Sequence, residues 1–273
     1  MINTEECLLF LKGIILQAGL RVLEIYQNKD FQIKIKNDNS PLTRADLISH
    51  EIICRELSKN YPTIPILSEE SCESFSILNP NSLFWCIDPI DGTKEFIKRN
   101  DEFTINIALI SNKKPILGVI YTPALDQLYY AIKGKGSYYE TKNLSKKIMA
   151  KKADKHNLVF AVSRSHISDK TLNFLDSFKS KTTKRIGSSL KLCVVAMGEV
   201  DCYPRFGPTS LWDIAAGHII LNEAGGYVLD KSLNEIEYDF TKGFINCDFF
   251  AVNHFFYEEL LNDQKKYLSS KSR

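Results

Sequence analysis

The stretch WCIDPIDGTKEF, residues 85–96, places two carboxylates beside a forced turn at the end of a strand. The apolar run 84–87 is typical of a buried strand. Pro89 has no amide hydrogen to donate to a central ladder, so we expect the chain to leave the sheet at Asp88. Gly92 then permits backbone angles that other residues avoid. The stretch therefore predicts a buried strand that ends in a turn.

This turn can bring the carboxylates of Asp88 and Asp91 together. Residues three apart in a straight strand point to opposite faces, whereas a turn can place both carboxylates on one side with the Ile90 carbonyl between them. Such a group of oxygen atoms suits a hard cation. The stretch alone leaves the alternative open, a loop in which the Asp-Pro and Asp-Gly pairs only make turns.

Composition and charge narrow the class of protein. A chain of 273 residues with 44% hydrophobic residues can form one large domain or two modest ones with a real core. The 35 basic and 33 acidic residues nearly balance, which argues against nucleic acid as the main partner. The seven cysteines form no CxxC pair and lie mostly in apolar segments, so we predict neither a disulfide framework nor a zinc site.

The N-terminal segment lacks the pattern of a secretion signal. Glu5 and Glu6 precede its apolar stretch, where a signal peptide is basic, and Lys12 interrupts it. No run reaches the roughly 18 apolar residues that a membrane span needs. We therefore expect a cytoplasmic protein with no transmembrane segment. Attachment to the inner face of a membrane, and the choice between monomer and homodimer, stay open.

The first 150 residues predict an α+β unit. Apolar residues at spacings of three and four predict a long helix over about 4–28, and a second helix is expected over about 43–59. Alternation predicts a half-buried strand over 31–36, and a short strand is expected over 64–67. Four further strands separated by short turns predict an antiparallel meander. They are expected at 103–111, 116–121, 127–132 and 136–140.

Strands and helices alternate from about residue 151, which is typical of an α/β unit. The polar, lysine-rich stretch 142–155 predicts a boundary between an N-terminal domain, 1–150, and a C-terminal domain, 151–273. The tail from Gln264 is expected to fray. The expected elements are strands at 158–163, 183–186, 227–229 and 249–252 and helices at 168–179, 188–197 and 210–224, the last ended by Gly225-Gly226.

Four acidic residues lie at the ends of predicted elements and together would make an oxygen-rich pocket. They are Glu69 after the strand 64–67, Asp88 and Asp91 around the turn, and Asp213 in the first turn of the helix 210–224. Carboxylates without histidine favour magnesium over zinc, and two or three such ions would polarise a phosphoryl group. Each acid also has a simpler interpretation. Glu69 could be a surface acid, and Asp213 could complete a capping box with Ser210.

Asp46 and Thr93 are candidates for a second layer behind these acids. As catalytic residues, Thr93 would hold the attacking water with its hydroxyl, and Asp46 would accept a hydrogen bond from Thr93. Thr43 and Asp46 also fit a capping box, however, and Thr93 could cap a short helix that starts at Lys94. Spacing alone favours the caps.

These motifs resemble the lithium-sensitive, magnesium-dependent inositol monophosphatase superfamily over nearly the whole chain. The resemblance is carried by DPIDGT (88–93), by Glu69-Glu70-Ser71, and by Trp212-Asp213 with the helix that runs to Gly225-Gly226. Longer strings are similar to its bacterial CysQ branch, the 3'(2'),5'-bisphosphate nucleotidases. They are DPIDGTKEFIKRN (88–100), FTINIALI (103–110), SRSH (163–166), GSSLK (187–191) and YPRFGPTSLWD (203–213).

The resemblance implies a layered αβαβα sandwich of the inositol monophosphatase and fructose-1,6-bisphosphatase type, with the active site in the cleft between the two parts. It implies two or three Mg²⁺ ions held by Glu69, Asp88, Asp91, Asp213 and the Ile90 carbonyl, and catalytic roles for Asp46, Thr93 and Glu69. The substrate-binding residues that it implies are Glu69, Asp91, Gly92, Thr93, His166, Ser188, Lys191, Arg205 and Asp213.

The residues assigned to the nucleotide suit phosphate chemically. Arg205 offers a planar donor fork and Lys191 a point charge. Ser188 would lie at a helix N-terminus, where backbone amides favour an anion. The simpler interpretations are a solvated helix residue for Lys191, an N-cap for Ser188 and a loop histidine for His166.

The implied reaction is hydrolysis of the 3'-phosphate of adenosine 3',5'-bisphosphate to AMP and phosphate, with the sulfated precursor as a further substrate and a link to sulfate assimilation. One alternative is a phosphatase of the same superfamily that acts on inositol phosphates or fructose bisphosphate. Another is a non-catalytic nucleotide-binding sensor, although no ligand residue is missing. DPIDGT alone points to the superfamily, whereas KEFIKRN, GSSLK and YPRFGPT point to a nucleotide.

Overall fold

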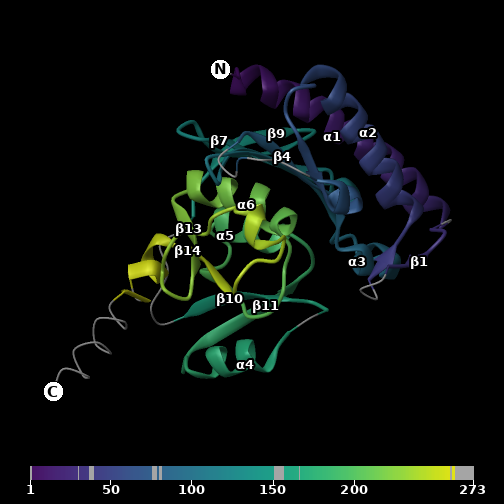
Figure 1. The fold of residues 1–273 in the computed structure, drawn as a ribbon. Helices are drawn as coiled ribbons and strands as arrows, with labels where there is room; N and C mark the ends of the chain where they lie inside the picture. Colours follow the sequence, from purple (N-terminus) through teal and green to yellow (C-terminus); the bar gives the residue numbers. More distant parts are fainter. Residues whose placement is uncertain are drawn as a thin grey trace.

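The computed structural model describes residues 2–29, 31–36, 40–75, 79, 82–150, 157–165, 167–258 and 260–261. They form five layers in the order helix, sheet, helix, sheet, helix (Figure 1). The predicted αβαβα sandwich is therefore confirmed. No helix in these residues is both long enough and apolar enough to cross a membrane.

The first layer consists of α1 (Thr4–Asn28) and α2 (Arg44–Asn60), which match the predicted helices. Asn3 caps α1 by accepting from the amides of Glu5 and Glu6. The buried stripe of α1, which includes Leu11 and Ile15, packs against the face of the larger sheet that carries Trp85 and Ile87. Because side chains alternate along a strand, Cys86 and Asp88 face the opposite side, toward the middle layer.

The larger sheet has seven strands and contains the predicted meander. Its strands, in spatial order, are β3 (Ile66–Ser68), β4 (Phe84–Asp91), β5 (Thr104–Ser111), β6 (Lys114–Thr122), β7 (Gln127–Ile132), β8 (Gly136–Thr141) and β9 (Leu144–Ile148). Strands β3 and β4 are parallel, and the other neighbours are antiparallel. Strand β9 occupies part of the stretch 142–155 that was expected to be a linker, and 151–156 lie outside the described residues.

Strand β4 does not end at Asp88, so that prediction is wrong. Asp88 pairs with Asn106 and Asp91 pairs with Thr104, so β4 carries one extra residue between these two pairs. Pro89 lies in the resulting bulge, where the ladder needs no amide hydrogen, and its carbonyl accepts from Ser49 Oγ at 2.8 Å. The bulge rather than a turn brings Asp91 to the side of the sheet that carries Asp88.

The predicted half-buried strand over 31–36 is also wrong. Strand β1 (Lys34–Ile35) pairs for two residues with β2 (Pro41–Leu42), and both of its residues are exposed. Ile33 and Ile35 are 49% and 66% exposed. Alternation indicates burial only where a second layer covers one face, and β1 lies apart from both large sheets.

The middle layer consists of α5 (Leu190–Ala196) and α6 (Leu211–Glu223), between the two large sheets (Figure 1). Helix α6 is buried nearly all round, as a helix between two sheets must be. Gly118 of β6 allows this packing, because a Cβ there would lie 2.7 Å from the Ala216 carbonyl oxygen. The N-terminal turn of α6 carries Asp213.

The smaller sheet confirms the predicted α/β alternation. Its order is β11 (Lys181–Ile186), β10 (Leu158–Ser163), β12 (Cys202–Arg205), β14 (Phe249–Asn253) and β13 (Gly226–Asp230). Strand β10 is parallel to both neighbours, whereas β14 is antiparallel to its own. Helix α4 (Asp169–Asp176), shorter than predicted, covers the outer face through the aromatic cluster of Phe160, Phe174 and Phe250. The tail from Gln264 lies outside the described residues.

Candidate active site

A cavity of about 780 Å³ is lined by residues from both halves of the chain. Ten of the predicted site residues line it, and they come from η1 (Glu69–Ser74), β4, the start of α3 (Thr93–Lys98), the turn before α5, β12 and α6. These ten are Glu69, Asp88, Ile90, Asp91, Gly92, Thr93, Ser188, Lys191, Arg205 and Asp213. Asp46 lies buried behind Thr93, and His166 lies outside the described residues.

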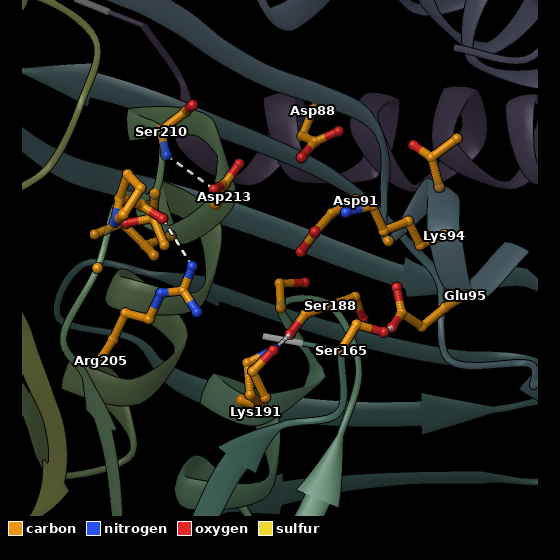
Figure 2. A pocket seen from close by; sticks show the side chains of 18 of the residues that line it. Asp88, Asp91, Lys94, Glu95, Ser165, Ser188, Lys191, Arg205, Ser210 and Asp213 are labelled. Carbon is orange, nitrogen blue, oxygen red and sulfur yellow. Dashed lines mark hydrogen bonds between the residues drawn. The ribbon is translucent and has the colours of Figure 1, made fainter. Parts of the chain in front are cut away.

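The acidic wall of the cavity consists of Glu69, Asp88, Asp91 and Asp213. Figure 2 shows the last three turned toward a common space. Burial, and then repulsion by neighbouring carboxylates, raises the pKa of Asp88 and of Asp213 well above the usual range. Burial also raises the pKa of Asp91 to about 6, although Lys191 opposes the shift. The acids therefore lie close enough to repel one another strongly.

The donor set of the acidic wall fits a hard divalent cation. It offers only oxygen atoms, and the repulsion that raises these pKa values is what a bound cation would cancel. In their present rotamers, no three His, Cys, Asp or Glu side chains of the described ranges converge on one ion. Glu69 instead accepts from Lys36 Nζ at 2.7 Å. Coordination by three of these side chains would therefore require other rotamers in the acidic wall.

Asp213 and Asp46 each complete a capping box at a helix start and also lie at the candidate site. Asp213 accepts from the Ser210 amide through Oδ2 at 2.8 Å, as in a capping box, and still lines the cavity. Asp46 accepts from the Thr43 amide through Oδ2 at 2.7 Å and from Thr93 Oγ through Oδ1 at 3.1 Å. In each case the cap fixes the carboxylate at a helix start.

Thr93 is not a helix cap, contrary to what spacing favoured. Gly92 is the N-cap of α3 and has a φ of 90°, in the left-handed region that glycine tolerates. A Cβ at Gly92 would also lie 3.2 Å from both the Glu102 carbonyl oxygen and Ser188 Cβ. The Thr93 hydroxyl is therefore directed to Asp46, and Asp46 keeps a pKa of about 6 because burial raises it.

The basic wall of the cavity consists of Lys191 and Arg205, which lie across from Asp91 in Figure 2. Lys191 is only 6% exposed, so its interpretation as a solvated helix residue is wrong. Its Nζ donates to the Ser188 carbonyl and lies 5.2 Å from the centre of the Tyr203 ring. Burial lowers the pKa of Lys191, and Asp91 opposes that shift. Arg205 Nη2 donates to the Pro208 carbonyl at 2.7 Å.

Ser188 precedes helix α5 instead of starting it, so the predicted helix begins two residues too early, but the Ser188 hydroxyl still accepts from the Leu190 amide at 3.4 Å. Helix α5 begins at Leu190 with Ser189 as its N-cap, and Ser188 precedes both in a left-handed conformation with a φ of 47°. Ser188 still lines the cavity and is 8% exposed. It reaches the site through a tight turn that lies against Gly92.

Sequence reasoning missed three residues around the site. Lys36 forms ion pairs with Glu69 and Glu70, at 2.7 Å each. The alternating pattern around Lys36 did not indicate these ion pairs. Ser189 Oγ donates to Asn106 Oδ1 at 2.8 Å. Asn106 had a signal, a single amide inside the apolar run FTINIALI. Its Nδ2 is buried with no hydrogen-bond partner among the described residues.

Comparisons with known proteins show which family the chain resembles. The profile of the inositol monophosphatase family matches residues 3–267. The 3'(2'),5'-bisphosphate nucleotidase CysQ of Salmonella typhimurium is 43% identical over 233 residues, which are 85% of this chain and 94% of the relative. The crystal structure of CysQ from Bacteroides thetaiotaomicron matches with a TM-score of 0.75 at 36% identity, over 88% of this chain and 94% of that one. The Thermotoga maritima IMPase matches with a TM-score of 0.79 at 25% identity, over 97% and 99% of the two chains.

Proposed function

The chain belongs to the inositol monophosphatase family, and we propose that it is a magnesium-dependent phosphoric monoester hydrolase that converts adenosine 3',5'-bisphosphate to AMP and phosphate. One observation carries the proposal, the acidic and basic walls that face each other across one cavity. An acidic wall serves a metal-dependent phosphatase, and a separate basic wall serves a second phosphate. The name of the Salmonella relative supports the same substrate class.

The acidic wall would hold the metal. Two or three Mg²⁺ ions would be bound by Glu69, Asp88, Asp91, Asp213 and the Ile90 carbonyl, all of which line the cavity. Bound there, magnesium supplies neutralisation of the phosphoryl charge and a water of lowered pKa.

Thr93 and Asp46 would orient the attacking water. The Thr93 hydroxyl lies 3.1 Å from Asp46 Oδ1 and 3.4 Å from the Ile90 carbonyl oxygen, and donating its one proton to either acceptor leaves its oxygen to accept a hydrogen bond from a water. Asp46 is itself fixed by the Thr43 amide, so this acceptor is held in place beside Thr93. The pair thus aligns the nucleophile with the phosphorus, a contribution from orientation.

The basic wall would bind the rest of the nucleotide. Arg205 and Lys191 would face the second phosphate, and Ser188 would contact the nucleoside. His166 keeps its predicted role here as a proposal. Hydrolysis of the sulfated precursor and a role in sulfate assimilation belong to the same proposal, because the precursor carries the same 3'-phosphate. The cytoplasmic location and the monomeric or dimeric state remain predictions.

A panel of phosphate esters tests the proposal. We expect purified protein to release phosphate from adenosine 3',5'-bisphosphate faster than from inositol monophosphate or fructose 1,6-bisphosphate, and only with magnesium. Millimolar lithium should inhibit the reaction. Faster turnover of inositol monophosphate would favour the alternative within the family, and nucleotide binding without turnover would favour the non-catalytic sensor.

A further inference from the structure

An ion pair outside the cavity holds the turn 187–189. Arg164 donates to Glu102 through Nε and Nη2, at 2.6 Å each, which is the bidentate geometry of a guanidinium fork. The same Glu102 carboxylate accepts from the Gly187 amide at 2.7 Å. Arg164 Nη2 also donates to the Arg185 carbonyl at 2.8 Å. One carboxylate thus connects the segment before β5 with the ends of β10 and β11.

The turn that these bonds fix shapes the basic wall. Ser188, in its centre, has a left-handed φ of 47°, which residues with a side chain rarely adopt. Its carbonyl accepts from Lys191 Nζ, so the position of the turn sets the position of the ammonium group. Gly187 has no spare room, because a Cβ there would lie 2.7 Å from Glu95 Cγ.

The other end of the turn is held separately. Ser189 Oγ bonds to Asn106 and to Thr104 Oγ, each at 2.8 Å, and these partners belong to β5 of the larger sheet. The Ser189 backbone also bonds to Asp91 and opposes the rise in pKa that burial causes in that acid. The Ser189 end is therefore tied to the acidic wall, whereas the Gly187 end depends on Glu102 and Arg164.

We propose that Glu102 and Arg164 are positioning residues that fix the turn 187–189 and so determine how well the enzyme binds the part of its substrate beyond the reacting phosphate. Both lie outside the cavity lining, so they act through Ser188 and Lys191. This inference rests on the proposed function, because it assigns those two residues to the nucleotide. Since Ser189 stays anchored to β5, loosening the pair leaves the acidic wall in place.

Steady-state kinetics on two substrates tests the inference. Adenosine 3',5'-bisphosphate uses both walls, whereas p-nitrophenyl phosphate has no second phosphate for the basic wall. We expect Arg164→Ala to raise KM for the bisphosphate about tenfold with kcat within about twofold, because uniform binding is lost. We expect kcat/KM for p-nitrophenyl phosphate to stay within about twofold of wild type, because that substrate does not reach the turn.

Conservative and double variants separate positioning from general loss of charge. Arg164→Lys keeps the charge without the fork and should fall between wild type and Arg164→Ala. Glu102→Gln should raise KM for the bisphosphate as much as Arg164→Ala does. The double variant should raise it no further than either single variant, because both changes break the same interaction. Lys181→Ala is the matched control, since it breaks the ion pair of Lys181 with Asp176, at 2.9 Å in the same half of the chain. This control should change neither kcat nor KM for either substrate.

Two results would overturn the inference. One is an equal fall in kcat/KM for both substrates. It would mean that the ion pair of Glu102 and Arg164 only stabilises the fold, and a fall in Tm would accompany it. The other is an unchanged KM for the bisphosphate in Arg164→Ala. The wild-type enzyme tests the proposed function independently. If it prefers another phosphate ester, the variants are compared on that ester and on p-nitrophenyl phosphate, with the same two overturning results.

Discussion

The two walls of the cavity are built from different kinds of structure. Asp88 and Asp91 project from β4, an inner strand of the larger sheet, and Asp213 projects from the buried helix α6. The basic wall depends on Lys191 of the seven-residue helix α5 and on Arg205 at the end of β12. Asp88, Asp91 and Asp213 therefore take their geometry from regular, buried elements, whereas the position of the Lys191 ammonium group also depends on its hydrogen bond to the left-handed turn at Ser188.

This difference suggests a division of labour between the walls. Groups that must be placed with little error around the reacting phosphate benefit from rigid elements. Groups that recognise the rest of a substrate can vary with less damage to the chemistry, as loops commonly do. Substitutions in the acidic wall should therefore reduce kcat, and substitutions in the basic wall should raise KM and change the choice of substrate.

The largest effect is expected for Asp91→Asn. The variant keeps the size of the side chain but removes a charge from the proposed metal site, so kcat should fall at least about a thousandfold with the fold intact. Phosphate release and circular dichroism measure the two parts of the prediction. Asp176→Asn, the same chemical change at a side chain that is 77% exposed, is the control. Full activity of Asp91→Asn without magnesium would refute the assignment of the acidic wall.

Thr93→Val tests the water-orienting pair behind the acidic wall. The substitution removes the hydroxyl that donates to Asp46 at 3.1 Å while keeping the branched shape. We expect kcat to fall about a hundredfold with KM little changed, since an oriented group contributes to the transition state. Thr122→Val is a matched control, because it removes a hydroxyl that donates at 3.1 Å to the Gln127 carbonyl. Similar kcat losses in both variants would remove Thr93 from the mechanism.

Lys191→Met tests the basic wall and should show the opposite kinetic pattern. It replaces a buried ammonium with an unbranched apolar side chain, so KM for the bisphosphate should rise about 10- to 100-fold while kcat changes little. The kcat/KM for p-nitrophenyl phosphate should be retained. Lys184→Met, at an exposed lysine of β11, is the control. An equal fall in kcat/KM for both substrates would mean that the basic wall does not act selectively on the second phosphate.

The same difference explains what could be predicted from the sequence. Asp88, Asp91 and Asp213 lie in or beside regular elements, so periodicity and capping patterns predicted where they would be placed. The error at Asp88 was local, because a bulge can accept Pro89 without ending the strand. The conformation of Ser188 could not be predicted, because Glu102 and Gly92 impose it from 86 and 96 residues away in the chain.

Lys36 and the strand 31–36 show a second limit. The alternating pattern there predicted a strand buried on one face, but Phe31 packs against the core while Ile33 and Ile35 are exposed. The partners of Lys36, Glu69 and Glu70, belong to a different element, and no local pattern connects them. Local propensity therefore gave the elements, and long-range contacts decided which polar side chains reach the cavity.

The smallest effect is expected at Glu235, which does not line the cavity. It tests whether contacts to α6 outside the cavity affect only the stability of the fold or also the acidic wall. His218 of α6 bonds to Glu235 Oε1 at 3.2 Å and to the Tyr238 hydroxyl at 3.0 Å. Burial lowers the pKa of His218, and the hydrogen bond with His218 lowers the pKa of Glu235 from its usual 4.5 to about 2. A lowered carboxyl pKa stabilises the fold fully above 4.5, and this contribution is lost as the pH falls through about 2.

Glu235→Gln should therefore reduce the free energy of unfolding by about 1 kcal/mol at neutral pH, a small value because the side chain is partly solvent-screened. The difference from wild type should shrink as the pH falls from 4.5 toward 2, in urea unfolding followed by fluorescence. Both kcat and the preference between the two substrates should stay unchanged, because Glu235 contacts α6 at His218 and Asn222, in the half of the helix away from Asp213. A selective loss of kcat would mean that the charge at Glu235 is felt in the acidic wall, and the rigidity of that wall would then depend on more than its own caps.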